Sequence, residues 1–116
     1  HPAACAAAVA TLDIFEKEKL FDRAAEMSAY FLESVFSLQN LGVVTDVRGY
    51  GMLAGFDIAS EGAPGARGNL LQKRLFDAGL HIKTTGDAGL LAPALIVEKE
   101  QIDEMVEILK QELIRL

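Results

Sequence analysis

Apolar residues recur every three or four positions in several parts of the chain, which is the spacing of one helical face. Pro2 suits the first turn of a helix, and the alanine-rich run that follows it as far as Phe15 predicts a first helix. A second helix is predicted over 21–38, with asparagine and glycine at 40–42 to end it. The first helix begins with small side chains only, Cys5 among them. We therefore expect another backbone to pack closely against it and Cys5 to be buried.

Two more helices are predicted further along the chain. Asn69 is a good N-cap for a third helix that ends at Gly79, and the glycine-rich segment ahead of it is expected to be a flexible surface loop. The last helix runs from about Lys99 to the end, with a regular apolar stripe. Glu98 is a weak N-cap by itself, but Gln101 can reach back to it in a partial capping box.

Apolar and polar residues alternate in the segments between the second and the last helix, which predicts four strands. The first two cover 43–48 and 52–59, and the glycines between them favour a hairpin. In the first strand, one face is expected to hold Val43, Thr45 and Val47. The other two strands cover 80–85 and 90–92 around a glycine turn. This order of elements predicts an α+β fold: a two-layer sandwich with helices on one face of a small antiparallel sheet, preceded by a long helix.

Composition and charge limit the partners and the cellular locations that we expect for this chain. The chain has 116 residues, a net charge of -6 and 51% hydrophobic residues. An acidic balance argues against nucleic acid or an anionic membrane as a partner, and the longest uncharged apolar stretch is too short to span a bilayer. One cysteine allows no internal disulfide, and nothing points to an oxidising compartment, so a cytoplasmic location is expected. Some of the apolar surface is expected to contact another domain or subunit.

Few residues are arranged for chemistry, since no zinc-binding, HExxH, GxSxG or Walker-type pattern occurs and no metal is expected. Arg48 lies beside the glycine turn of the first hairpin, where it could bind an anion or simply be solvated. Lys83 lies on a predicted strand, a firm support for a cation that recognises a carboxylate, and Asp87 across the following turn could orient it. The alternative for Lys83 is an ordinary surface lysine.

Three segments resemble, in order, the C-terminal part of class III aminotransferases, which use pyridoxal phosphate. They are HPAACAAAVATLDIF at the start, RGYGMLAGFDI from Arg48, and the tract from GLHIKTTGD to LLAPALIV, which ends at Val97. The resemblance covers essentially the entire chain. Within the class it is greatest to omega-amino acid or beta-alanine:pyruvate aminotransferases.

The resemblance implies that residues 1–116 are the C-terminal small domain of a larger subunit. A large domain ahead of His1 would carry the Schiff-base lysine and most contacts to pyridoxal phosphate, so no catalytic or cofactor-binding residue is expected in this segment, which should be inactive alone. The partners implied are this large domain, a small-molecule amino donor and keto acid, and a second subunit in a homodimer.

The resemblance also implies roles for the three candidate residues. The small domain of the family closes over the substrate and binds its carboxylate, and Lys83 matches a strand position usually held by arginine. A lysine keeps the charge but not the planar two-point grip on a carboxylate. Asp87 matches the Gly-Asp pair that follows this strand. Arg48 matches the RGxG turn, where a structural or entrance role is expected before a catalytic one.

The function implied is transfer of an amino group from an omega-amino acid or an amine to a keto acid such as pyruvate. Two alternatives remain at this point. One is another class III enzyme, such as a diamine or ornithine aminotransferase or an aminomutase. The other is a non-enzymatic α+β binding module, which should be a stable monomer as these 116 residues, whereas a severed small domain should expose apolar surface.

Overall fold

The computed structural model describes all 116 residues. Its elements, in chain order, are α1 (Pro2–Lys17), α2 (Leu20–Phe36), the short 3-10 helix η1 (Ser37–Asn40), β1 (Val44–Tyr50), β2 (Leu53–Ile58), α3 (Ala66–Asp77), β3 (Lys83–Thr85), β4 (Ala88–Leu91) and α4 (Lys99–Ile114). The four strands form one sheet in the order β1-β2-β4-β3, and each neighbouring pair is antiparallel. Apart from η1, the order of helices and strands is the one that the sequence predicts.

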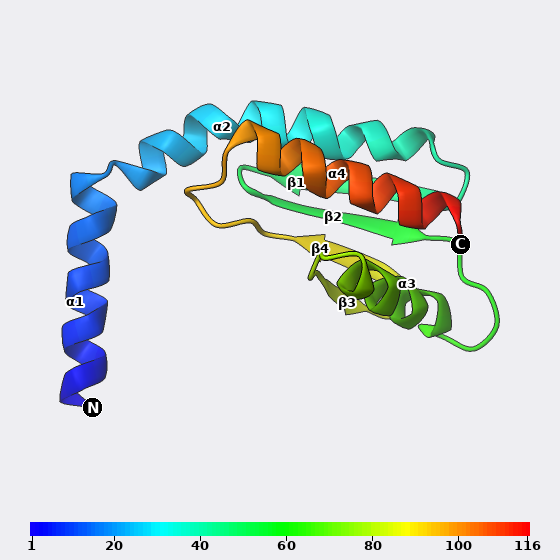
Figure 1. Cartoon of the computed structure of the whole chain (residues 1–116), viewed down its shortest axis with the longest axis horizontal. Coiled ribbons are helices and arrows are strands. Elements are labelled where there is room, and N and C mark those ends of the chain that lie inside the picture. Colours follow the sequence, from blue (N-terminus) through cyan, green and yellow to red (C-terminus); the bar gives the residue numbers. More distant parts are fainter.

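Helices cover one face of the sheet, so the predicted two-layer α+β sandwich is confirmed. Figure 1 shows α2 and α4 running along the sheet, with α3 near β3 and β4 and α1 leading away from the other elements. The strands bury alternate side chains against the helices, namely Val47, Ala54, Phe56, Ile58 and Leu91. The opposite face has no helix on it and carries exposed residues such as Tyr50 and Leu53.

The core takes from each of α2, α3 and α4 residues that are four or seven positions apart, and this spacing places them on one helical face. Its helical members include Phe31, Val35, Leu71, Leu75, Ile102, Leu109 and Leu113. Phe56 of β2 is fully buried among the core residues and lies against Gly89 of β4. A Cβ on Gly89 would lie 2.4 Å from the Phe56 ring, so the ring occupies space that only glycine leaves open at this position.

The structure corrects the predicted face of the first strand. Val44 and Val47 are the buried residues of β1, and Val43, Thr45 and Val47 do not share a face. The register between β1 and β2 shifts between Val44 and Asp46, so that Thr45 is an extra residue without a partner. Such a bulge displaces the alternation by one position, which a strict period of two cannot reveal.

The boundaries of the third helix and of the second hairpin also differ from the prediction. α3 begins at Ala66 with Gly65 as its N-cap, so Asn69 lies inside the helix and the preceding loop is shorter than expected. The hairpin turn is only two residues long, Gly86 and Asp87, between β3 and β4. The capping box of α4 is formed as predicted.

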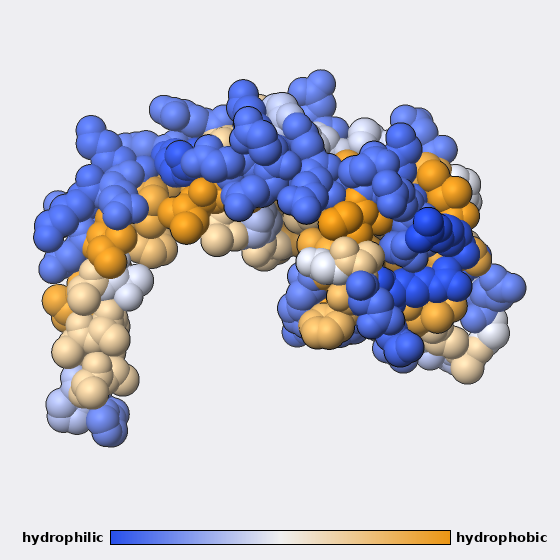
Figure 2. Space-filling model, viewed as in Figure 1, coloured by the Kyte–Doolittle hydropathy of each residue, from blue (hydrophilic) through white to orange (hydrophobic).

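α1 leaves the rest of the molecule at a sharp bend, where Lys19 adopts a left-handed conformation with φ 51°. Phe15 and Phe21 contact each other across this bend, their ring centroids 5.2 Å apart. No residue of α1 is buried, and Cys5 is exposed, so the predicted burial of Cys5 does not occur within this chain. Figure 2 shows apolar residues along the inner side of the bend and hydrophilic residues on its outer side.

Candidate functional site

The open face of the sheet brings two of the predicted site residues into one row. Arg48 pairs with Gly55, Gly55 pairs with Leu90, and Leu90 pairs with Lys83. Residues directly opposite one another on antiparallel strands point to the same side, so Arg48 and Lys83 project from one face at the two edges of the sheet. Neighbouring strands lie about 4.8 Å apart, and three such spacings separate β1 from β3. The backbone positions of Arg48 and Lys83 are therefore about 14 Å apart.

Arg48 is neutralised by two carboxylates. Its Nη1 donates to Asp46 Oδ2 at 2.7 Å, and its Nη1 and Nη2 donate to Asp57 Oδ2 and Oδ1 at 2.9 and 3.0 Å. The hydrogen bonds to Asp57 and then to Asp46 raise the pKa of the Arg48 guanidinium. The two-point contact with Asp57 ties β1 to β2 across the sheet. These two carboxylates take three of the five N–H donors of Arg48, so a further anion would have to compete with them for the guanidinium.

Lys83, unlike Arg48, has no carboxylate partner within the chain. Its side chain is exposed, and it makes no ion pair or hydrogen bond in the structure. The neighbour in the row is the apolar Leu90, which is 38% exposed and provides no competing acceptor. Thr84, the next residue on β3, points to the other face and hydrogen-bonds with Gln72 of α3. Lys83 therefore lies on a strand that is held to α3 through Thr84 and Gln72, and its ammonium group is available to a ligand.

Asp87 does not lie against Lys83 but against the start of α3. Its Oδ1 accepts a hydrogen bond from the Gly68 N–H at 2.9 Å, and its Oδ2 accepts from Ser60 Oγ at 2.7 Å and from the Gly65 N–H at 3.4 Å. These bonds, that from Ser60 foremost, lower the pKa of the Asp87 carboxyl. The N-cap residue Gly65 has no side chain to accept from the Gly68 N–H, so Asp87 takes the place of an N-cap side chain.

A polar cavity of about 470 Å³ surrounds the turn that holds Asp87. Its lining includes Asp57, Ser60, Thr85 and Asp87, and only two of its ten lining residues are hydrophobic. Asp57 is occupied by Arg48, and Asp87 by the start of α3. The remaining polar groups are hydroxyls and backbone groups.

A second and larger cavity, of about 570 Å³, lies where the chain before β3 and the chain after β4 diverge. Nine of its thirteen lining residues are hydrophobic. They come from three places: the approach to β3 from Leu80, the end of β4 with the segment up to Val97, and Met105 of α4. No residue of β3 lines this cavity, but Ile82, which precedes Lys83, and Leu90, which pairs with Lys83, both do.

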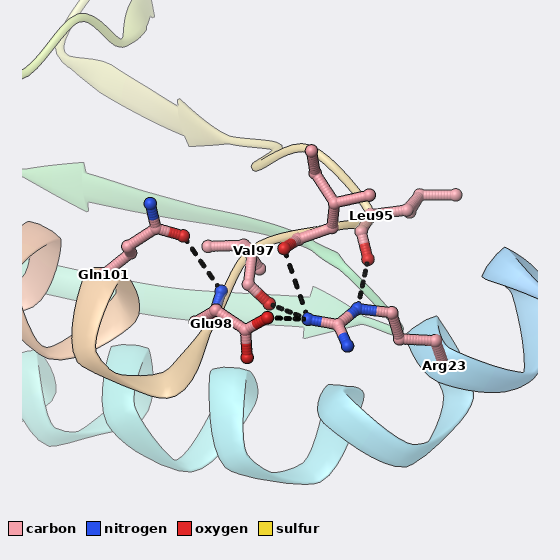
Figure 3. A network of polar contacts seen from close by, with 6 residues as sticks. Arg23, Leu95, Val97, Glu98 and Gln101 are labelled. Atoms are coloured by element: carbon pink, nitrogen blue, oxygen red, sulfur yellow. Dashed lines mark hydrogen bonds and ion pairs between the residues drawn. The ribbon is translucent and has the colours of Figure 1, made fainter. Parts of the chain in front are cut away.

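Arg23 of α2 holds one wall of this cavity in place. Figure 3 shows its guanidinium directed at the segment that precedes α4. Nε donates to the Leu95 carbonyl at 3.2 Å, and Nη2 donates to the Ile96 and Val97 carbonyls at 3.2 and 3.0 Å and to Glu98 Oε1 at 2.8 Å. Sequence reasoning missed Arg23, because its acceptors are mostly backbone carbonyls of an irregular segment and leave no pattern of residue types.

Comparison with known proteins places this chain in a family. The model of the class-III aminotransferase family matches residues 1–113, so the chain belongs to that family. It is 43% identical over 112 residues to the omega-aminotransferase of Caulobacter vibrioides, covering 96% of this chain and 26% of that protein. It is 35% identical to the ornithine aminotransferase of Bacillus subtilis, covering 95% of this chain and 26% of that protein.

Solved structures agree with the family assignment. The omega transaminase of Pseudomonas jessenii, in complex with PMP, superimposes with a TM-score of 0.90 at 28% identity. The match covers 97% of this chain and 26% of that one. The chain therefore spans about a quarter of the length of the relatives that it matches, and within that quarter the fold is shared.

The residues of this chain do not by themselves form a site for pyridoxal phosphate, the cofactor that the family uses. A Schiff-base lysine needs an enclosed site beside the cofactor ring, and every lysine here is exposed. Neither of the two larger cavities has a lysine in its lining. No cluster of three or more acidic, histidine or cysteine side chains could hold a metal ion, and no helix is long and apolar enough to cross a membrane.

Proposed function

We propose that the chain is the C-terminal small domain of a pyridoxal-phosphate-dependent transaminase. The whole protein would move an amino group from an omega-amino acid or an amine to a keto acid such as pyruvate, in the cytoplasm and as a homodimer. Membership of the class-III aminotransferase family and the 43% identity to an omega-aminotransferase support this proposal. The cofactor and its lysine would belong to the part of the protein ahead of His1.

Within that reaction, the proposed task of this domain is to bind the substrate carboxylate through Lys83. The observation that carries the proposal is the contrast along one row of the sheet: Arg48 is paired with two carboxylates, whereas Lys83 has no partner. An ammonium group with no internal counter-ion gains more from a substrate carboxylate than a guanidinium that would first have to leave its own. The neighbouring side chain, Leu90, has no acceptor that could compete with a substrate carboxylate for Lys83.

Replacing Lys83 tests this role in the full-length enzyme. Lys83→Ala is expected to raise the apparent KM for beta-alanine or pyruvate about tenfold or more, because a hydrogen bond to a charged group contributes about 1.5 kcal/mol or more. The KM for a neutral amine donor should change much less, since it has no carboxylate to lose. Steady-state kinetics with each donor measures both.

Two further variants sharpen the result. Lys83→Arg keeps the charge and adds a second donor, so it should restore a low KM for the carboxylate substrates. Lys110→Ala removes another exposed lysine, from α4 on the helical layer, and should leave the kinetics unchanged. Equal effects of Lys83→Ala on carboxylate and neutral donors would exclude the role proposed for Lys83.

A second candidate function has a specific observation in its favour. The relatives include ornithine aminotransferases at 35% identity and an acetylornithine aminotransferase from Methanosarcina acetivorans at 36%. A donor panel of beta-alanine, ornithine and N-acetylornithine, with the full-length protein, separates these activities. A preference for beta-alanine supports the first proposal. A preference for ornithine or N-acetylornithine would favour the second candidate function instead. Family membership weighs against a non-enzymatic binding module.

A further inference from the structure

The turn between β3 and β4 is clamped to the start of α3 by one side chain. Both carboxylate oxygens of Asp87 are used: Oδ1 by the Gly68 N–H, and Oδ2 by the Ser60 hydroxyl and more distantly by the Gly65 N–H. Gly65 is the N-cap of α3 and has no side chain to do this itself. Asp87 therefore serves as a cap from another segment of the chain, and its negative charge lies at the positive end of the helix.

The contact between turn and helix leaves no spare room. A Cβ on Gly68 would lie 2.0 Å from the Gly86 carbonyl oxygen and 3.1 Å from Asp87 Cα, and a Cβ on Gly65 would lie 3.3 Å from Gly86 Cα. Glycine at Gly65 and Gly68 thus allows the two backbones to meet directly. The position of the turn relative to α3 is fixed by backbone contact as well as by hydrogen bonds.

The same clamp fixes the strand that carries Lys83. β3 is only three residues long and forms the edge of the sheet, with β4 as its single neighbour. It is attached to α3 at two points, through Thr84 and Gln72 and, just past its end, through Asp87. An edge strand this short has few ladder bonds of its own, so these attachments set where Lys83 lies.

We propose that Asp87 is a positioning residue for carboxylate recognition: it does not touch the substrate but holds the β3–β4 turn on α3 so that Lys83 reaches it. This inference rests on the proposed function of Lys83. It differs from the role suggested by the sequence, in which Asp87 acts on Lys83 directly, because the Asp87 oxygens bond to Ser60 and to the start of α3.

A double-mutant cycle in the full-length enzyme tests the proposal. Lys83→Ala, Asp87→Asn and the double variant are compared by the ratio of kcat/KM for beta-alanine to that for a neutral amine. Asp87→Asn keeps the size of the side chain but places an NH₂ group where one acceptor was, opposite a donor. It is expected to lower this ratio about fivefold when Lys83 is present and to change it little when Lys83 is absent.

The outcomes separate the two proposals. If Lys83→Ala leaves the ratio unchanged, the proposed function of Lys83 fails. If Lys83→Ala lowers the ratio but Asp87→Asn lowers kcat/KM equally for both donors, or acts equally in the Lys83→Ala background, Asp87 is merely structural and only the present inference is overturned.

A milder variant keeps the proposal testable if Asp87→Asn does not fold. Ser60→Ala removes only one of the donors to Asp87 and leaves both N–H bonds in place. It should lower the same ratio by a smaller factor, about twofold. Ser37→Ala is the matched control, because the Ser37 hydroxyl bonds to the Ser34 carbonyl at the end of α2. A ratio unchanged in Ser60→Ala would count against the positioning role.

Discussion

Gly68 is the residue at which the structure is least tolerant of a side chain. It lies in the first turn of α3, and the atoms that a Cβ would meet are backbone atoms of Gly86 and Asp87. Such atoms cannot rotate away as the end of a flexible side chain can. The usual benefit of alanine over glycine in a helix, about 1 kcal/mol, should therefore be reversed here.

We predict that Gly68→Ala lowers the free energy of unfolding by about 1–3 kcal/mol, the range found when a packed site receives an extra carbon. Urea unfolding followed by circular dichroism measures this. The control is Gly42→Ala, since nothing lies within 4 Å of a Cβ there and no positive φ is required. Gly42→Ala should change stability by less than about 0.5 kcal/mol. Two variants of equal stability would contradict the account of the Gly68 contact.

At the residue scale, the sequence predicts where charged groups lie better than it predicts what they bind. Strand alternation and the glycine turn correctly place Lys83 on a strand and Asp87 in the turn after it. The partners of Asp87 were not predictable, because two of them are backbone N–H groups of glycines about 20 positions earlier, and glycine carries no side chain that signals such a bond. The binding roles of Lys83, Asp87 and Arg48 stay predictions.

At the scale of elements, the segment between β4 and α4 depends on α2. This segment has no regular ladder of its own, and Arg23 donates to the carbonyls of Leu95, Ile96 and Val97. Within the segment, the Val97 N–H donates to the Ala94 carbonyl. A lysine in place of Arg23 could reach at most some of these acceptors, because its donors spread from a single nitrogen.

We predict that Arg23→Ala speeds hydrogen exchange of the Val97 amide about tenfold, which corresponds to losing about 1.4 kcal/mol of local stability. Arg23→Lys should have an intermediate effect. Amides of β1 and β2 serve as the internal reference, and Lys73→Ala, which removes an exposed pair with Asp77, is the control variant. Unchanged exchange at Val97 in Arg23→Ala would show that the segment does not depend on α2.

Regular elements were predictable to the extent that their causes are local. The apolar spacing of α2 and α4 and the capping box of α4 lie within a few residues of one another, and these features are confirmed. The early start of α3 was not predictable, because the group that caps it, Asp87, follows the helix in the chain. The bulge at Thr45 was missed for a related reason: it is defined by the register with β2 and leaves no mark on β1 itself.

At the scale of the whole molecule, several large apolar side chains stay exposed on the surface and do not enter the core. Val9, Leu12, Phe21 and Ile96 are each 59–69% exposed, and apolar residues are visible along the inner side of the bend between α1 and the rest. The composition predicted an excess of apolar surface but not its position, which depends on the angle at Lys19. Such a surface fits a domain that packs against further parts of its own protein.

α1 provides a direct test of that idea. A helix of 16 residues with no buried residue is of marginal stability by itself. In the isolated 116-residue chain, the α1 amides should therefore exchange within the dead time of a hydrogen-exchange experiment. In the full-length protein they should be protected, with the small side chains around Cys5 in contact with the large domain. Equal exchange of α1 in both proteins would contradict the proposed packing.

The measurement that tests the central claim most directly is amino transfer by the full-length protein. The protein is purified with pyridoxal phosphate and supplied with beta-alanine as donor and pyruvate as acceptor, and the alanine formed is quantified with and without the cofactor. The account predicts cofactor-dependent formation of alanine, reduced by Lys83→Ala. A folded full-length protein that binds no pyridoxal phosphate and forms no alanine from beta-alanine, ornithine or a neutral amine would contradict it.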